Sequence, residues 1–215
     1  MMKNFVVSDS NIFIDLFETG ILVKFFELPW EIHTTNTIVK ELKNPGIDVL
    51  LSAQIVSGRL NIHIVDDNIQ ASLPQSSSSG VSSRLSLQDY SALYVSYSEG
   101  YMLLTGDRRL KRRAESLHVE VHGILYVIKA MYDARILPAE IVLNVLNDLS
   151  STNRRLPAKE ISQMRSQLKT IISEDSVTKE FIDSYAGVWA GEEYQCIEDS
   201  IRRERVNRSS DIDNI

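Results

Sequence analysis

The sequence contains a single cysteine, Cys196, so a disulfide bond within the chain is impossible and nothing indicates an oxidising compartment. It has no apolar run long enough to cross a bilayer. Its first residues, MMKNFVVSDSNIF, lack the basic segment followed by an apolar segment that marks a signal peptide. These absences predict a cytoplasmic protein that does not associate with membranes.

The chain also lacks the positive net charge that is common in nucleic-acid-binding proteins. It carries 23 Lys and Arg against 29 Asp and Glu, a formal net charge of −6. Residues 1–173 balance, with 18 basic and 18 acidic residues, whereas residues 174–215 hold 5 basic and 11 acidic residues. The negative excess therefore lies at the end of the chain, and the neutral body neither supports nor excludes RNA binding.

Length and patterning favour one domain with an appendage. A chain of 215 residues, 43 % of them hydrophobic, can bury one substantial core with some sequence left over. Short apolar runs have the character of strands, and segments with helical spacing separate them; the runs are residues 5–8, 31–34, 60–65, 101–105 and 119–121. The alternation predicts a three-layer α/β/α domain with a mainly parallel sheet over residues 1–172, and an acidic helical tail over residues 173–215.

Two further expectations concern the connections. Asn44-Pro45-Gly46 is expected to end one helix, and residues 48–56 to form the next. The stretch from residue 66 to residue 84 contains four consecutive serines and a glycine without any apolar period. This composition is typical of a loop.

Aspartates follow two of the predicted strands. Asp9 comes directly after the first strand and Asp107 just after the fourth. Ligands of open parallel sheets bind outside the carboxyl ends of the strands, so both positions are candidates for chemistry. Either aspartate could instead cap the helix that follows it, which is a common role for the residue at this position.

Four segments resemble, in order, the motifs of PIN-domain ribonucleases, and in particular the VapC-like toxins of bacterial and archaeal toxin–antitoxin pairs. The segments are Ser8-Asp9-Ser10-Asn11-Ile12-Phe13-Ile14-Asp15-Leu16, Val39-Lys40-Glu41-Leu42, Leu85-Ser86-Leu87-Gln88-Asp89-Tyr90-Ser91-Ala92-Leu93 and Leu104-Thr105-Gly106-Asp107-Arg108-Arg109-Leu110. The similarity covers roughly residues 4–172. It implies the PIN fold and a metal-dependent endoribonuclease.

The resemblance also implies which residues form the site. Four acids would gather two divalent cations, Mg²⁺ or Mn²⁺, and these acids are Asp9, Glu41, Asp89 and Asp107. We expect Asp9 and Asp107 to be the main ligands, with Asn11 and Thr105 orienting them. Such cations prefer oxygen ligands, and a pair of them can promote an in-line phosphodiester displacement. Glu41 could instead be an exposed helical charge, and Asp89 could simply cap its helix.

A basic run directly after Asp107 is the candidate RNA-binding segment, and its residues are Arg108, Arg109, Lys111 and Arg112. Cations at a helix N-terminus oppose the helix dipole, so helix stability does not explain them. We expect them to contact phosphates beside the scissile bond. The alternative is a solvated helix paired with local acids such as Glu115.

The histidines show no metal-ligand spacing with the cysteine, and they are His33, His63, His118 and His122. The sequence therefore predicts no zinc site.

The acidic tail resembles the toxin-binding end of VapB-type antitoxins. The runs that carry this resemblance are Ala186-Gly187-Val188-Trp189 and Ile201-Arg202-Arg203-Glu204-Arg205. It implies that Trp189 lies in a groove and that Arg202 or Arg205 enters the acidic site, which would inhibit the enzyme in cis or on a neighbour. The alternative is an ordinary terminal helix that packs on the domain or on a second subunit.

The predicted function is hydrolysis of RNA phosphodiester bonds by a toxin, restrained by a VapB-like antitoxin or by its own tail. The resemblance further implies a homodimer. Two rival interpretations stay open. One is a structure-selective DNA nuclease that uses the same metal site, and the other is a non-catalytic protein-interaction module with a vestigial site.

Overall fold

The computed structural model describes residues 4–66, 73–74, 85–152 and 156–174. Its elements, in chain order, are β1 (Asn4–Ser8), α1 (Ser10–Glu18), α2 (Leu22–Phe25), β2 (Trp30–Thr35), α3 (Asn36–Glu41), α4 (Pro45–Val56), β3 (Leu60–His63), α5 (Leu87–Glu99), β4 (Met102–Leu104), α6 (Arg108–Ser116), β5 (Val121–His122), α7 (Ile124–Asp133), α8 (Ala139–Thr152) and α9 (Ala158–Glu174). No helix among the described residues is both long and apolar enough to span a membrane.

The chain packs as two units, residues 1–165 and residues 166–215. The first unit holds the sheet and its covering helices, and the division falls within α9. The boundary expected between residues 172 and 173 stays a prediction. The tail residues Trp189, Arg202 and Arg205 lie outside the described residues, so their inhibitory role also stays a prediction.

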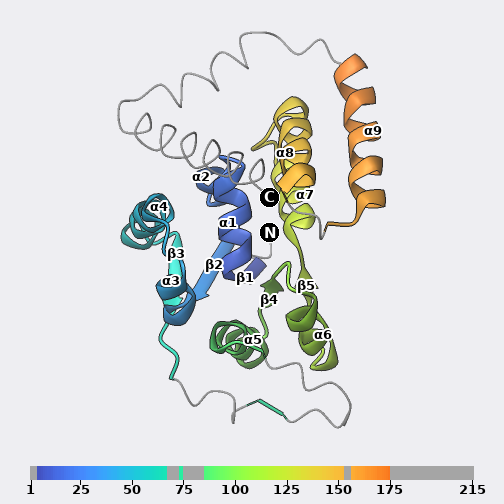
Figure 1. Cartoon of the computed structure of the whole chain (residues 1–215). Helices are drawn as coiled ribbons and strands as arrows, with labels where there is room; N and C mark the ends of the chain where they lie inside the picture. Colours follow the sequence, from blue (N-terminus) through green and yellow to red (C-terminus); the bar gives the residue numbers. More distant parts are fainter. Residues whose placement is uncertain (1–3, 67–72, 75–84, 153–155, 175–215) are drawn as a thin grey trace, which may run out of the picture. The chain divides into compact units, whose positions relative to one another are not determined.

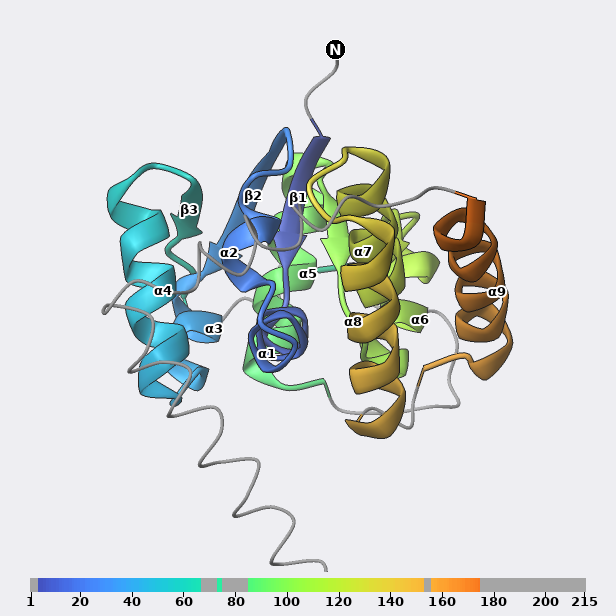
Figure 2. The same cartoon turned by 90° about the horizontal axis from the view of Figure 1, so that it is seen from above.

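The strands of the first unit form one five-stranded sheet in the order β3-β2-β1-β4-β5, and every neighbouring pair is parallel. Figure 1 shows α1 and α7 on one face of this sheet and α5 and α6 on the other. Seen from above, α1 lies in front of the sheet and α5 behind it (Figure 2). The predicted α/β fold with a parallel sheet is confirmed.

Burial on both faces explains why the central strands read as continuous apolar runs. Val6 and Val7 are adjacent in β1 and point to opposite faces, yet both are fully buried. Leu103 and Leu104 of β4 are likewise fully buried. Phe13 of α1, also fully buried, belongs to the aromatic group that covers the sheet on that side. This core fixes the strand ends on which the candidate site depends.

Two predicted boundaries were wrong. Helix α4 begins at Pro45 and not at residue 48, because the Asn44 side chain accepts a hydrogen bond from the Gly46 N–H at 2.9 Å and caps the helix. Proline is tolerated at the first helical position, where its missing N–H would have no partner. Strand β5 lies at Val121–His122, later than predicted, because the Val119 N–H bonds back to the Ala114 carbonyl of the preceding helix.

Candidate metal centre

The candidate site lies where the direction of strand order reverses. From β1 the chain adds β2 and then β3 on one side, and it returns to place β4 on the other side of β1. The Asp9 N–H donates to the Leu104 carbonyl at 3.0 Å, which fixes the carboxyl ends of β1 and β4 side by side. This reversal point is where open α/β sheets bind their ligands.

Asp9 is buried at this point, with 2 % of its surface exposed. Its Oδ1 accepts a hydrogen bond from the Ser10 N–H at 2.7 Å, so it caps α1 as one interpretation expected. Its Oδ2 accepts two further bonds, from Asn11 Nδ2 at 2.7 Å and from Thr105 Oγ1 at 2.8 Å. A helix cap needs only the first of these bonds, so the other two hold the carboxylate in one orientation for another reason.

Burial raises the pKa of Asp9 to about 6 from its ordinary value of 3.8. The hydrogen bonds from Thr105 and Ser10 oppose this shift, whereas the carboxylates of Asp89 and Glu41 add to it. Both charged side chains that act on Asp9 are therefore acidic, and they come from two other helices. A buried acid repelled by further acids is an arrangement that a bound cation would stabilise.

Asn11 and Thr105 join the two strand ends. Asn11 Oδ1 accepts a hydrogen bond from the Gly106 N–H at 2.8 Å, while its Nδ2 donates to Asp9. Thr105, which is 2 % exposed, accepts from the Asp107 N–H at 3.0 Å and donates to Asp9. The loop that carries Asp107 is thus tied to the Asp9 carboxylate by two neutral side chains, and their role in orienting metal ligands stays a prediction.

Asp107 itself caps α6. Its Oδ1 accepts hydrogen bonds from the Arg109 N–H at 2.7 Å and the Leu110 N–H at 3.0 Å. Unlike Asp9, it is half-buried. The capping interpretation therefore describes its present contacts, and its role as a metal ligand stays a prediction.

Glu41 and Asp89 lie on two other helices and act electrostatically on Asp9. Glu41 is exposed at the end of α3. Asp89 is half-buried and forms a reciprocal cap with Ser86 at the start of α5, with hydrogen bonds of 2.8 Å and 3.0 Å. The capping role expected as an alternative for Asp89 is thus present, and both acids still lie close enough to Asp9 to raise its pKa.

A cluster of buried hydroxyl groups, which the sequence did not predict, joins the two helices that carry these acids. Ser91 Oγ lies 2.7 Å from both Thr35 Oγ1 and Thr37 Oγ1, and the two threonine oxygens are 3.0 Å apart. All three residues are buried. The only signal in the sequence is a run of threonines at a strand end, TTNT, which is also typical of a helix cap.

The predicted RNA-binding residues of α6 are exposed, and they are Arg108, Arg109, Lys111 and Arg112. The pairing expected as an alternative is present for Lys111, whose Nζ lies 3.9 Å from Glu115. Arg113, the next basic residue, is half-buried and donates to the Pro74 carbonyl. The helix therefore presents its positive charge to solvent directly after Asp107.

The family model described as "DUF3368: PIN domain" matches residues 5–170. The chain belongs to the PIN-domain family. Among solved structures, it is similar to a PilT N-terminus domain protein from the hyperthermophilic archaeon Sulfolobus solfataricus P2, with 14 % identity, 59 % of this chain and 92 % of that chain covered, and a TM-score of 0.33. No curated protein matches the chain.

PIN domains are typically metal-dependent nucleases, and the four candidate ligands of this PIN domain are carboxylates. The acids supply only oxygen donors, which Mg²⁺ and Mn²⁺ prefer, and burial, with added repulsion from Asp89 and Glu41, raises the pKa of Asp9. Within the described residues, no three His, Cys, Asp or Glu side chains converge closely enough to share one ion. The chemistry of the donor set fits the cation, and the partly exposed acids would have to move toward Asp9 on binding.

Proposed function

We propose that this PIN domain is a metal-dependent endoribonuclease, the toxin of a toxin–antitoxin pair. The observation that carries the proposal is Asp9, a buried carboxyl at the reversal point of the sheet whose charged neighbours, Asp89 and Glu41, are both acidic. Burying a carboxylate among like charges destabilises the folded state, and a helix cap does not require it. A bound cation would offset the repulsion among these carboxylates.

In this proposal Asp9 and Asp107 are the main ligands of Mg²⁺ or Mn²⁺, and Glu41 and Asp89 complete the set. When bound, the ions activate water and stabilise the charge that develops on the phosphodiester. The protein residues prepare the site for them. Thr105 and Asn11 hold Oδ2 of Asp9 in place through bonds of 2.8 Å and 2.7 Å, so the carboxylate does not have to be ordered when a cation arrives.

The substrate is RNA, held by its backbone. Arg108, Arg109, Lys111 and Arg112 are exposed at the start of α6, next to Asp107, and they bind phosphates beside the scissile bond. These contacts place the strand without reading its sequence. The positive helix therefore supplies affinity, and the acids supply the chemistry.

Cleavage assays test the proposal. Single-stranded RNA, flapped DNA and duplex DNA are incubated with the protein and with Asp9→Asn, in Mg²⁺, in Mn²⁺ and in EDTA. We expect metal-dependent cleavage of RNA by the wild-type protein only. Cleavage of flapped DNA in preference to RNA would favour the rival DNA nuclease. No cleavage of any substrate, together with unaltered metal binding by Asp9→Asn, would favour the non-catalytic interaction module.

We further propose that the activity is restrained by residues 173–215, in cis or on a neighbouring copy, or by a VapB-like antitoxin, and that the protein is a homodimer. An arginine that enters a carboxylate cluster forms charge-assisted bonds and replaces a cation. The double variant Arg202→Ala/Arg205→Ala and the variant Trp189→Ala should then cleave RNA faster than the wild-type protein. Unchanged rates would leave the tail with a structural role only. Light scattering measures the oligomeric state.

A further inference from the structure

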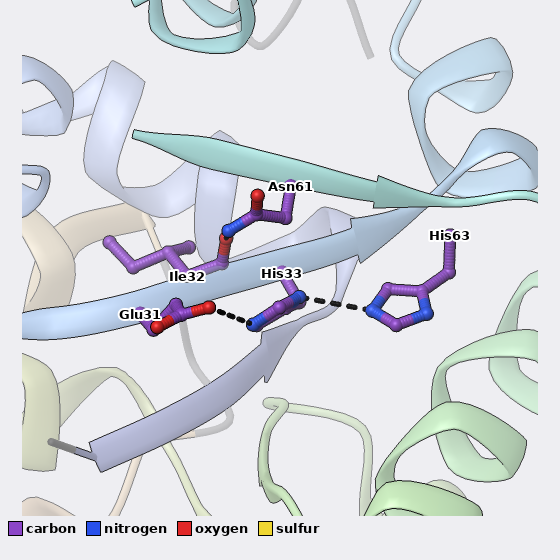
Figure 3. Close-up of polar contacts among 5 residues, drawn as sticks. All are labelled: Glu31, Ile32, His33, Asn61 and His63. Atoms are coloured by element: carbon purple, nitrogen blue, oxygen red, sulfur yellow. Dashed lines mark hydrogen bonds and ion pairs between the residues drawn. The ribbon is translucent and has the colours of Figure 1, made fainter. Parts of the chain in front are cut away.

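A pair of histidines lies on the sheet away from the acids. In the parallel register of β2 and β3, His33 is opposite Asn61 and Thr35 is opposite His63, so both histidines point to the same face on neighbouring strands. His63 Nε2 is 3.0 Å from His33 Nδ1. Figure 3 shows Glu31, His33 and His63 in a row, with His33 between the other two. The two histidines are 30 residues apart along the chain, so the sequence alone did not predict that they meet.

Aromatic side chains hold the inner histidine in place. His33 is 5 % exposed, and its ring lies 4.8 Å from the ring of Tyr101 and 6.3 Å from that of Phe5. His63, by contrast, is partly exposed, and its ring is 6.4 Å from Tyr101. The pair therefore combines one fixed imidazole with one that can adjust.

The outer nitrogen of His33 is incompletely satisfied. Within the described residues His33 Nε2 is buried and has no hydrogen-bond partner, and the Glu31 carboxylate lies 3.7 Å away, beyond hydrogen-bonding distance. A proton on Nε2 faces this carboxylate favourably, whereas a lone pair there would be repelled. The proton of neutral His33 therefore belongs on Nε2, and its Nδ1 offers a lone pair toward His63.

We propose that His33 Nδ1 and His63 Nε2 together bind a divalent transition-metal ion of the zinc class. At a tetrahedral ion with Zn–N bonds of 2.0–2.1 Å, two nitrogen ligands lie about 3.3 Å apart. The two nitrogens are already 3.0 Å apart, and the partly exposed His63 ring has to turn so that both lone pairs converge on the ion. The hydrogen that His63 carries on Nε2 moves to its Nδ1 through solvent, and both ligands stay neutral. Water completes the coordination shell.

The surroundings of the pair favour a cation. A histidine that binds a metal usually donates its other N–H to a carboxylate, and Glu31 occupies that position behind His33. Charge withdrawn by the ion strengthens this N–H as a donor and draws Glu31 closer, which satisfies the orphaned nitrogen. Glu99, at the end of α5, adds a second negative charge that acts on His33. Burial and His63 nevertheless hold the pKa of His33 below its ordinary value of 6.5, so the ring is neutral and able to bind a metal at neutral pH.

A metal at this position would join β3, which lies at the edge of the sheet, to β2. The consequence is structural: the ion links two strands at residues 33 and 63 and opposes fraying of the edge. The proposal does not rest on the nuclease assignment, because the donors are nitrogens on a different pair of strands. Ions that prefer oxygen, such as Mg²⁺, should not compete for the pair.

Zinc and cobalt titrations of the full chain test the proposal, in a Cys196→Ser background that removes the thiol as a ligand. Calorimetry, the visible spectrum of Co²⁺ and the melting temperature are followed with Mg²⁺ in excess. We expect one ion per chain, a higher melting temperature, and binding at least tenfold weaker in His63→Gln. The matched control is His122→Gln, because His122 also faces a carboxylate, Glu120, at 2.8 Å and also packs on a tyrosine, yet has no second imidazole.

A second measurement needs no substitution at His33 or His63. It follows the NMR chemical shifts of the imidazole nitrogens in the protein that keeps all four histidines. Zn²⁺ should first perturb the signals of His33 and His63 and leave those of His118 and His122 unchanged. Equal zinc affinity in His63→Gln and His122→Gln, or zinc-induced shifts confined to other histidines, would overturn the proposal. Absence of any zinc binding would do the same.

Discussion

The acids at the strand ends and the histidine pair are both groups of ionisable side chains on one sheet, but their electrostatic surroundings differ. Asp9 is a buried acid whose charged neighbours are acids, held by neutral donors from Asn11 and Thr105. His33 is a buried neutral base with a carboxylate behind it. The strand-end acids are charged and suit a hard cation that prefers oxygen ligands. The histidine pair offers nitrogen lone pairs, which suit a softer cation. The difference predicts that each site can be disabled without the other.

The largest effect is expected from Asp9→Asn. The change removes the negative charge on which cation binding depends but keeps a side chain of the same shape. Loss of a single orienting partner typically lowers metal affinity or activity by 10–100-fold, so loss of a direct ligand should lower cleavage by at least about 100-fold. The measurement is the initial rate on single-stranded RNA, with circular dichroism to verify the fold. His63→Gln, the control from the other site, should cleave at the wild-type rate; equal losses in both variants would contradict the separation of the two sites.

The pH dependence of stability is the next largest effect. Because the pKa of Asp9 is about 6 in the folded state and 3.8 is its ordinary value, the folded state binds more protons than the unfolded state between these values. The free energy of unfolding of the metal-free protein should therefore fall as pH rises from about 4 to about 6, by about 3 kcal/mol, and stay lower above that range. Urea unfolding in EDTA measures the effect.

Asp9→Asn provides the control for this pH dependence, because it lacks the titrating group. The free energy of unfolding of Asp9→Asn should vary less across the same range. In the wild-type protein at pH 7, added Mn²⁺ should raise the free energy of unfolding by mass action. An identical decline with pH in both proteins would show that another group is responsible.

Thr105→Val should have a smaller effect. The change keeps the shape of the side chain but removes the hydroxyl that donates to Asp9 and accepts from the Asp107 N–H. Without that donor the pKa of Asp9 should rise further and Mn²⁺ should bind about tenfold more weakly. Thr19→Val is a matched control, because the Thr19 hydroxyl donates to the Asp15 carbonyl at 2.7 Å and plays no part in the site. Equal Mn²⁺ affinities in the two variants would show that the Thr105 hydroxyl plays no part in binding the cation.

The smallest effect is expected from the double variant Arg108→Ala/Arg109→Ala at the start of α6. Loss of two phosphate contacts should reduce the salt dependence of RNA binding, by about 1.4 in the slope of log K against log salt, while Mn²⁺ affinity stays the same. Filter binding to single-stranded RNA in EDTA at several salt concentrations measures the slope. Lys129→Ala removes an exposed cation from α7 and should change nothing; a slope equal to that of the wild-type protein in the double variant would exclude these arginines from the RNA contact.

Local pattern was sufficient to predict the fold and the strand-end acids. Strands buried on both faces leave continuous apolar runs, and Asp9 comes directly after one of these runs and Asp107 shortly after another. The start of α4 was misplaced because Pro45 was interpreted as a break, although proline also begins helices. A single-residue signal of this kind has two meanings, and only the cap formed by Asn44 decides between them.

Contacts between distant residues could not be predicted in the same way. Thr37 and Ser91 are 54 positions apart, and His33 and His63 are 30 apart. Whether such residues meet depends on strand register and on which face a helix covers, and a shift of one residue in a strand would turn a histidine to the other face. The distances of Glu41 and Asp89 from Asp9 depend on the same packing, since α3 and α5 are joined by the buried hydroxyl cluster.

The most direct test of the central claim, that the strand-end acids exist to hold a cation, is calorimetric titration of Mn²⁺ into the wild-type protein and into Asp9→Asn at pH 7. We expect saturable binding by the wild-type protein, a higher melting temperature with the ion, and neither effect in Asp9→Asn. Equal Mn²⁺ affinity in the two proteins, or no binding by the wild-type protein, would contradict it.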